Sequence, residues 1–157
     1  MSKRINILET EAKAYNAMLG LEKYLGASDL TKTHKELIKI RASQINGCAF
    51  CIDMHTKDAR KAGETEQRIY ALSAWREAPF FTEEERAILA LTEEVTLITG
   101  RVSDATYQRA EALLGSSYLA QVIMAIVTIN AWNRIAVTPQ LQPALTHEVV
   151  LLGQLHQ

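Results

Sequence analysis

A long stretch without a single charge, from Ala112 to Asn133, constrains the fold of this chain more than any other feature. Polar residues interrupt it, and its dense apolar part, Tyr118 to Trp132, is shorter than the roughly 20 residues that a bilayer-spanning helix needs. We therefore predict a buried helix over 117–137 and no membrane span. A helix that is apolar nearly all round must be covered on every side, by the chain's own core or by another subunit, which is a first indication of an oligomer.

Helical patterning dominates the rest of the chain, because Val and Ile do not alternate with polar residues and strong helix formers fill most segments. With 157 residues and 48% hydrophobic types, the chain is long enough for one compact domain and too short for two. The sequence predicts an all-α fold in a single domain, 1–157. Gly and Pro mark the breaks between the expected helices, which are 7–25, 32–46, 48–62, 65–76, 82–99, 103–114, 117–137 and a short one at 144–154.

The charges make nucleic acid an unexpected partner, because 17 Lys and Arg are interspersed with 18 Asp and Glu and the net charge is −1. Glu9, Glu11 and Lys13 fall where a secretion signal would need its apolar stretch, so we expect a cytoplasmic protein. Thiols are kept reduced in that compartment. A close cysteine pair there is more often catalytic, redox-active or metal-binding than a permanent crosslink.

The two cysteines of the chain, Cys48 and Cys51, stand at the start of the helix expected after Gly47. Backbone N–H groups and the helix dipole favour a negative charge there, and hence the thiolate form of either cysteine. Residues three and four apart share a helix face, so Cys48, Cys51 and His55 form one line. An imidazole at that spacing can accept a thiol proton and later pass it to a leaving group.

A histidine used in this way needs a partner that orients it, and Glu36 on the preceding helix is the candidate. If 32–46 and 48–62 form an antiparallel hairpin about Gly47, Glu36 lies about 16 Å before the turn and His55 about 12 Å after it. The two residues are then within about one helical turn of the same level. The sequence therefore predicts a proton relay from Glu36 through His55 to the cysteines.

Each of these residues also allows other interpretations. The cysteines could be simply buried or could bind a metal, but only Cys48, Cys51 and His55 lie close together, with Glu36 as an unusual fourth ligand for zinc. A c-type haem would require histidine directly after the second cysteine, where Ile52 stands. A thioredoxin-like fold would require a βαβ pattern, which is missing. Taken singly, His55 is more often a core histidine, and Glu36 more often a solvated residue.

The segment from Glu36 to His55, ELIKIRASQINGCAFCIDMH, resembles the core motif of the alkylhydroperoxidase D-like proteins of the carboxymuconolactone decarboxylase superfamily. The resemblance covers most of the chain to about residue 138. It continues through ARKAGE at 59–64, SAWREAPFF at 73–81, LTEEVT at 91–96 and INAWNR at 129–134.

The resemblance implies an all-α fold that assembles into trimers or hexamers, and a peroxidase that uses its dithiol without metal or haem. It implies that Cys51 is the thiol activated through His55 and Glu36, and that Cys48 is the resolving thiol. Helix position alone favours exposure of Cys48, whereas the spacing to the histidine favours activation of Cys51. The disulfide formed after reaction with a hydroperoxide would be reduced by a dithiol carrier, a lipoyl-bearing or thioredoxin-like protein.

The chain departs from this family at Phe50, where the best-understood peroxidases carry a second histidine just before the second cysteine. The lactone-decarboxylating branch lacks the cysteine pair, so Cys48 and Cys51 argue against decarboxylation. The main hypothesis is a thiol-dependent peroxidase. The alternatives are a general thiol–disulfide oxidoreductase and a non-enzymatic oligomeric module that senses oxidation or binds a metal. We further expect Glu93 to pair with Arg134, because a buried guanidinium needs an acceptor.

Overall fold

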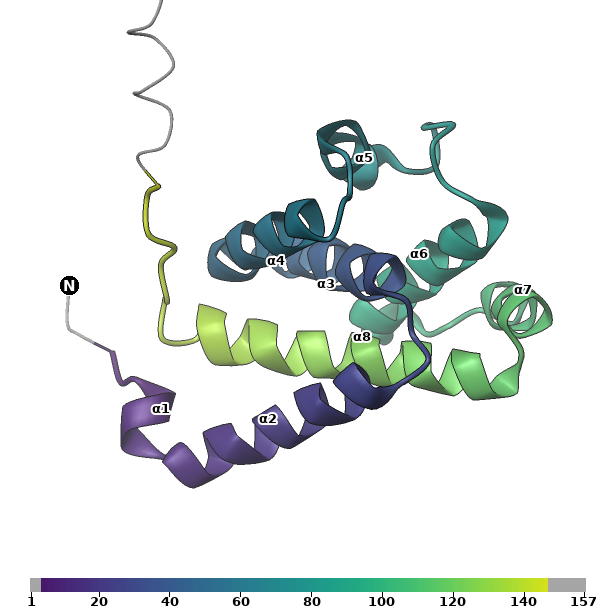
Figure 1. Cartoon of the computed structure of the whole chain (residues 1–157). Helices are drawn as coiled ribbons and strands as arrows, with labels where there is room; N and C mark the ends of the chain where they lie inside the picture. The colour runs from purple at the N-terminus through teal and green to yellow at the C-terminus, as the bar shows by residue number, and fades with distance from the viewer. Residues whose placement is uncertain (1–3, 147–157) are drawn as a thin grey trace, which may run out of the picture.

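The computed structural model describes residues 4–146, and this part of the chain is built from helices without any strand. The all-α fold class predicted from the sequence is thus confirmed. Figure 1 shows the helices in chain order. They are α1 (Ile7–Thr10), α2 (Ala12–Ala27), α3 (Lys32–Asn46), α4 (Ala49–Lys61), α5 (Glu66–Ala71), α6 (Glu83–Thr96), α7 (Asp104–Leu114) and α8 (Ser116–Val137), with short 3-10 turns at Leu72–Ala74 and Ile98–Gly100.

Helix α3 lies at the centre of the fold, because both of its sides carry core residues. Ile38 and Ala42 belong to an apolar cluster with α6, α7 and α8, whereas Leu37 and Ile40 belong to a second cluster with Trp75 and the chain around it. Helix α4 runs back along α3 as the second arm of a hairpin, and α2 lies along α8 (Figure 1). The predicted central hairpin that carries the cysteine motif is therefore present.

The ends of several helices are fixed by capping residues. The side chain of Thr82 accepts the backbone N–H of Glu85, and the Glu85 carboxylate accepts the N–H of Thr82, which completes a capping box at the start of α6. Ser103 caps α7 in the same way by accepting the N–H of Thr106. Gly47 ends α3 in the left-handed conformation, with φ at 65°, which glycine adopts without steric cost.

Several predicted boundaries differ from the structure. The helix expected at 7–25 is two helices, because the backbone leaves the helical region at Glu11 (φ −142°, ψ 67°). The helices expected at 65–76 and 82–99 both end as 3-10 turns, where tighter turns replace the last α-helical ones. The short helix expected at 144–154 lies mostly outside the described residues, and 144–146 are not helical. The outer limits of the predicted domain, 1–157, stay a prediction for the same reason.

Helix α8 matches the buried helix predicted at 117–137, but the chain does not cover it on all sides. It packs against α2, α3, α6 and α7, and its inward side carries Val122, Ile126 and Ile129, which have no exposed surface. Val127 on the other side is 45% exposed. By length and composition alone α8 could cross a membrane, although 39% of its most apolar window is buried inside this fold. The predictions of no membrane and of a homo-oligomer stay predictions, and light scattering would give the number of subunits.

Glu93 on α6 does not pair with Arg134, so that prediction is wrong. The carboxylate of Glu93 instead accepts hydrogen bonds from Arg41 Nε and Trp75 Nε1, each at 2.9 Å, and from Arg76. The Arg134 guanidinium lies at the surface, where it donates to the backbone and side-chain oxygens of Asn130. Burial alone would raise the pKa of Glu93, but the three hydrogen bonds outweigh it and hold that pKa below its ordinary value.

The Glu93→Gln variant is expected to be less stable than the wild type by about 1–3 kcal/mol at pH 7, because it removes charge-assisted hydrogen bonds. The pKa of this carboxyl is lower in the folded state than in the unfolded state, so its contribution is complete above the unfolded value of roughly 4.3 and is lost as the pH falls through the folded value. The difference in free energy of unfolding between the wild type and Glu93→Gln should therefore become smaller as the pH falls from 5 to 3. Urea denaturation over this range measures it, and a constant gap would contradict the proposed role of the charge.

Candidate active site

The turn at Gly47 places the two cysteines at the start of α4. The backbone N–H of Cys48 donates to the carbonyl of Ser43 at 3.0 Å, which ties the turn to the last turn of α3. Cys48 is the N-cap residue of α4, and its Sγ accepts the backbone N–H of Cys51 at 3.3 Å. One sulfur is therefore held directly at the N-terminus of a helix, as the sequence predicted from the position of Gly47.

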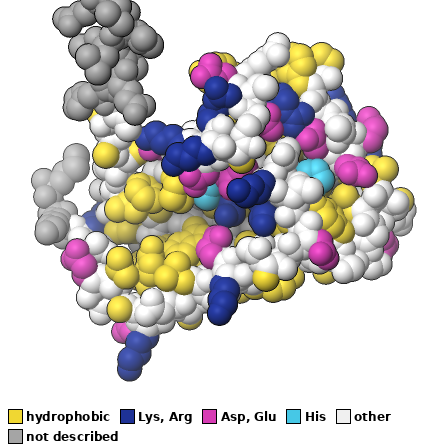
Figure 2. Space-filling view, viewed as in Figure 1, with side chains coloured by type: hydrophobic (Ala, Val, Ile, Leu, Met, Phe, Trp, Pro, Cys, Tyr) yellow, Lys and Arg dark blue, Asp and Glu magenta, His cyan; other side chains and the backbone are white. Residues whose placement is uncertain are grey.

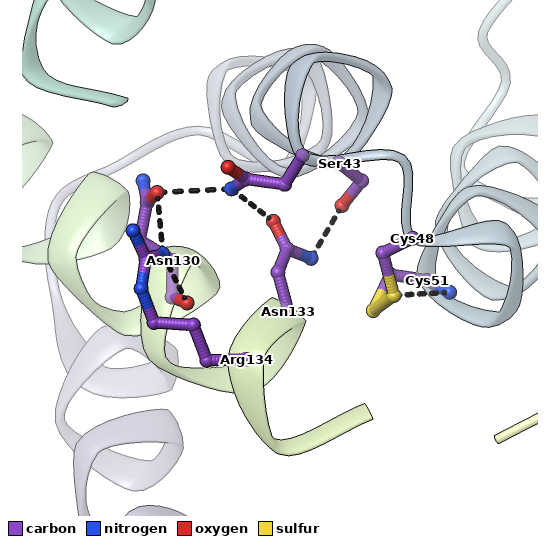
Figure 3. Close-up of a disulfide and its surroundings, with 7 residues drawn as sticks. Ser43, Cys48, Cys51, Asn130, Asn133 and Arg134 are labelled. Carbon is purple, nitrogen blue, oxygen red and sulfur yellow. Dashed lines mark hydrogen bonds between the residues drawn. A yellow bond between two sulfur atoms is a disulfide. The ribbon is translucent and has the colours of Figure 1, made fainter. Parts of the chain in front are cut away.

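Cys48 and Cys51 are joined by a disulfide, with their Cα atoms 5.3 Å apart (Figure 3). The structure therefore represents the oxidised state of the pair. Each cysteine is only 2% exposed, so the greater exposure expected for Cys48 is not seen. Such burial restricts access to small or slender reactants that can enter a cavity.

His55 and Glu36 meet across the hairpin, as the estimate from helix geometry predicted. Nδ1 of His55 lies 3.1 Å from Oε2 of Glu36, and both side chains are largely buried. Because an ionised carboxylate only accepts hydrogen bonds, Nδ1–H is the donor and Nε2 is the nitrogen left to take up a proton. His55 is one helical turn beyond Cys51 on α4. The arrangement has the parts of a carboxylate–histidine–thiol relay.

Cys51 and His55 both face an open cavity of about 400 Å³, which we call the apolar cavity. Its walls are mostly aromatic and aliphatic side chains from α2, α4 and α8, including Tyr15, Phe50, Met54 and Trp132. Cys48 does not line it. A reactant in the apolar cavity therefore meets Cys51 and His55 first, and its volume suits a small organic molecule.

Glu22 of α2 fixes one side of the apolar cavity. Its carboxylate accepts the indole N–H of Trp132 at 3.0 Å and the ammonium of Lys39 at 3.1 Å. The rings of Tyr15 and Trp132 pack edge to face, with centroids 5.2 Å apart. These contacts are important because α2 has one buried residue, Leu25, and depends on polar contacts for its position beside the site.

A largely buried network of side-chain amides supports the hairpin turn from the side of α8, as Figure 3 shows. Asn133 donates to Oγ of Ser43, and its own side-chain oxygen accepts from Asn46, both at 2.9 Å. Asn46 also donates to Asn130 at 2.9 Å. Since Ser43 and Asn46 belong to the last turn of α3, just before Gly47, the network fixes the residues from which the cysteine turn departs.

Metal ligation was the other use considered for these side chains. Within residues 4–146, no group of three or more His, Cys, Asp or Glu side chains is arranged to hold a metal ion. In the oxidised state both sulfurs are bonded to each other, whereas a metal is bound by the thiolate.

Comparison with known proteins places this geometry in a family. The model of the carboxymuconolactone decarboxylase family matches residues 10–94, which include the whole hairpin. The chain belongs to the carboxymuconolactone decarboxylase family. Within it the chain is alkylhydroperoxidase D-like, which confirms the resemblance seen in the sequence.

Individual relatives support the same assignment. The uncharacterized protein YdfG of Bacillus subtilis is 49% identical over 138 residues, which cover 87% of this chain and 94% of YdfG. A solved structure from Agrobacterium tumefaciens, a protein of unknown function with a suggested identity as the antioxidant defence protein AhpD, is 40% identical with a TM-score of 0.89. That match covers 92% of this chain and all of the other. The debrominase Bmp8 shares the fold at 17% identity, with a TM-score of 0.80 over 87% of this chain and 74% of its own.

Sequence reasoning singled out Glu36, Cys48, Cys51 and His55, which the hairpin brings close together, but missed most of the wall of the apolar cavity. Trp132 and Met54 are apolar residues with no feature in the sequence that separates them from core residues, yet both line the cavity and Met54 is 40% exposed. Glu22 and Lys39 were not singled out at all. Their signal in the sequence is weak, because the ion pair joins different helices and has no fixed spacing.

Proposed function

We propose that this carboxymuconolactone decarboxylase family protein is a thiol-dependent peroxidase that reduces organic hydroperoxides. The observation that carries the proposal is the position of Cys51 on the apolar cavity, beside a histidine whose other nitrogen is bound to Glu36. The antioxidant identity suggested for the Agrobacterium tumefaciens relative supports the same class of activity.

The chemistry balances with the residues present. His55 removes the proton of the Cys51 thiol, and the thiolate attacks the outer oxygen of the hydroperoxide. An S–O bond forms, the O–O bond breaks, and the alkoxide takes the proton from His55 to leave as an alcohol. Cys48 then attacks the sulfenic sulfur of Cys51, which forms the disulfide and releases water. Glu36 orients the imidazole and stabilises its charged form.

A dithiol carrier must return two electrons to the disulfide. Because both cysteines are almost fully buried, a slender lipoyl arm fits the cavity better than the bulky disulfide site of a thioredoxin-like protein. The same burial disfavours the alternative function, general reduction of protein disulfides. Where the best-understood relatives have a second histidine, this chain has Phe50, which forms part of the wall of the apolar cavity. Proton transfer here therefore depends on His55 and Glu36. We place this reaction in the cytoplasm, where thiol carriers are kept reduced.

Stopped-flow mixing of fully reduced protein with a small excess of cumene hydroperoxide tests the proposal. We expect both thiols to be lost together, much faster than free cysteine reacts, with an intact mass that corresponds to one disulfide. Thiols that survive on the timescale of free cysteine would reject the peroxidase function. Rapid oxidation by a small disulfide in the same assay, without oxidation by peroxide, would favour the oxidoreductase.

A further inference from the structure

A second cavity, of about 380 Å³, continues from the apolar cavity along α3. We call it the lysine cavity, because Lys32, Lys35, Lys39 and Lys61 line it. The two cavities share Glu22, Lys39 and Asp58, and Glu36 faces the lysine cavity while its partner His55 faces the apolar one. Figure 2 shows hydrophobic side chains gathered on one part of this face and charged side chains directly beside them.

The lysine cavity has cationic charge that its own carboxylates do not neutralise. Lys39 is paired with Glu22 and Lys61 with Asp58, and Glu36 is bound to His55. Lys35 donates to the backbone carbonyl of Leu25 at 3.1 Å. Among the described residues, neither Lys32 nor Lys35 forms an ion pair with a carboxylate. Two ammonium groups at the outer end of the cavity are therefore available for an anion.

A single elongated ligand can span the distance between these lysines and the dithiol. Lys32 is four residues from Glu36, which pairs with His55, and His55 is four residues from Cys51. Both steps run toward the turn of the hairpin. At a rise of 1.5 Å per residue they separate Lys32 from Cys51 by about 12 Å along the helix axes. An anionic group at Lys32 and Lys35 would thus be separated from Cys51 by an apolar body that fills the apolar cavity.

We propose that the substrate is an organic hydroperoxide with an apolar body and a carboxylate, in which Lys32 and Lys35 bind the carboxylate and the apolar cavity holds the body. The inference rests on the proposed function, whose reaction it leaves unchanged. It assigns Lys32 and Lys35 a role in substrate specificity. A fatty acid and an aromatic acid share this chemistry, and the apolar cavity accepts the body of either.

Binding of decanoate, measured by titration calorimetry, tests the lysine contacts without any redox step. We expect decanoate to bind the wild-type protein and to bind the Lys32→Gln/Lys35→Gln variant at least tenfold more weakly, because two cations are lost. Decan-1-ol should bind both proteins equally. Lys23→Gln, which changes an exposed lysine of α2 outside both cavities, is the matched control and should behave as the wild type. Lys32→Gln alone, at an exposed position, should show a smaller loss.

Kinetics with linoleic acid hydroperoxide and its methyl ester complete the test. The double variant should raise KM for the acid at least tenfold and leave KM for the ester and kcat for both unchanged. Equal decanoate binding by the wild type and the double variant, or equal KM for the acid, would overturn the inference. Reaction with cumene hydroperoxide tests the peroxidase function separately. If the protein reacts with cumene hydroperoxide but decanoate binding does not depend on the two lysines, only the inference about the lysines is rejected.

Discussion

The Cys51→Ser variant is expected to lose peroxide consumption by at least about 10³-fold, because the hydroxyl of serine cannot replace a thiolate as the nucleophile toward an O–O bond. Cys51 faces the apolar cavity beside His55, whereas Cys48 does not line that cavity. The measurement is the rate of cumene hydroperoxide loss with excess dithiothreitol as the reductant. The fold should persist, since serine is close in size to cysteine.

The Cys48→Ser variant is the matched control, because it changes the other sulfur of the same disulfide. We expect Cys51 to react once in this variant and to gain one oxygen atom as a sulfenic acid, which dimedone traps for mass spectrometry. If Cys51→Ser consumes peroxide as fast as the wild type while Cys48→Ser does not, the attacking thiol is Cys48. The roles of the two cysteines would then be exchanged.

The His55→Ala variant is expected to lower the rate of thiol oxidation at pH 7 by about 10²-fold or more, which is the usual contribution of a positioned base. The difference should shrink above about pH 8.5, where a free thiol ionises without help. Glu36→Gln should show a smaller loss with the same dependence on pH, because it acts through the histidine. Stopped-flow thiol oxidation between pH 6 and pH 10 measures both variants.

Asp58→Asn is the control for this pair of variants, because Asp58 lies on α4 and lines the same cavity, and its carboxylate pairs with Lys61 and not with His55. It should leave the rate and its pH profile unchanged. A His55 variant whose deficit persists at pH 10 would contradict proton removal by His55. Such a result would mean that the residue only supports the local structure.

The fold was predictable where one residue type determines the local backbone. Gly47 has the positive φ that ends α3, and Thr82 with Glu85 forms the capping box that starts α6. The break at Glu11 was not predictable, because apolar periodicity continues through it and only the backbone shows the interruption. The helices predicted at 65–76 and 82–99 extend beyond the observed ends of α5 and α6 for the same reason.

The contact between Glu36 and His55 was predictable because both residues lie on one hairpin whose turn the sequence marks. Helix rise and periodicity then place His55 opposite Glu36, and the structure gives 3.1 Å between their side chains. Partners on helices that are distant in the sequence were not predictable. Glu93 accepts hydrogen bonds from Arg41 and Trp75 and does not pair with Arg134, and Glu22 links α2 to α3 and α8. These contacts depend on the crossing angles and rotations of whole helices.

The hydrogen bond from the Cys51 N–H to Cys48 Sγ links the redox state of the dithiol to the start of α4. In the disulfide this sulfur is a weak, neutral acceptor. After reduction the same atom can carry a full negative charge, and a charged acceptor at a helix N-terminus is bound more strongly. The fold thus stabilises the reduced pair relative to the oxidised one, which raises its reduction potential. A pair poised in this way gives up its disulfide readily to a carrier, and Cys48 is then already held at the start of α4 for its attack on the next sulfenic acid.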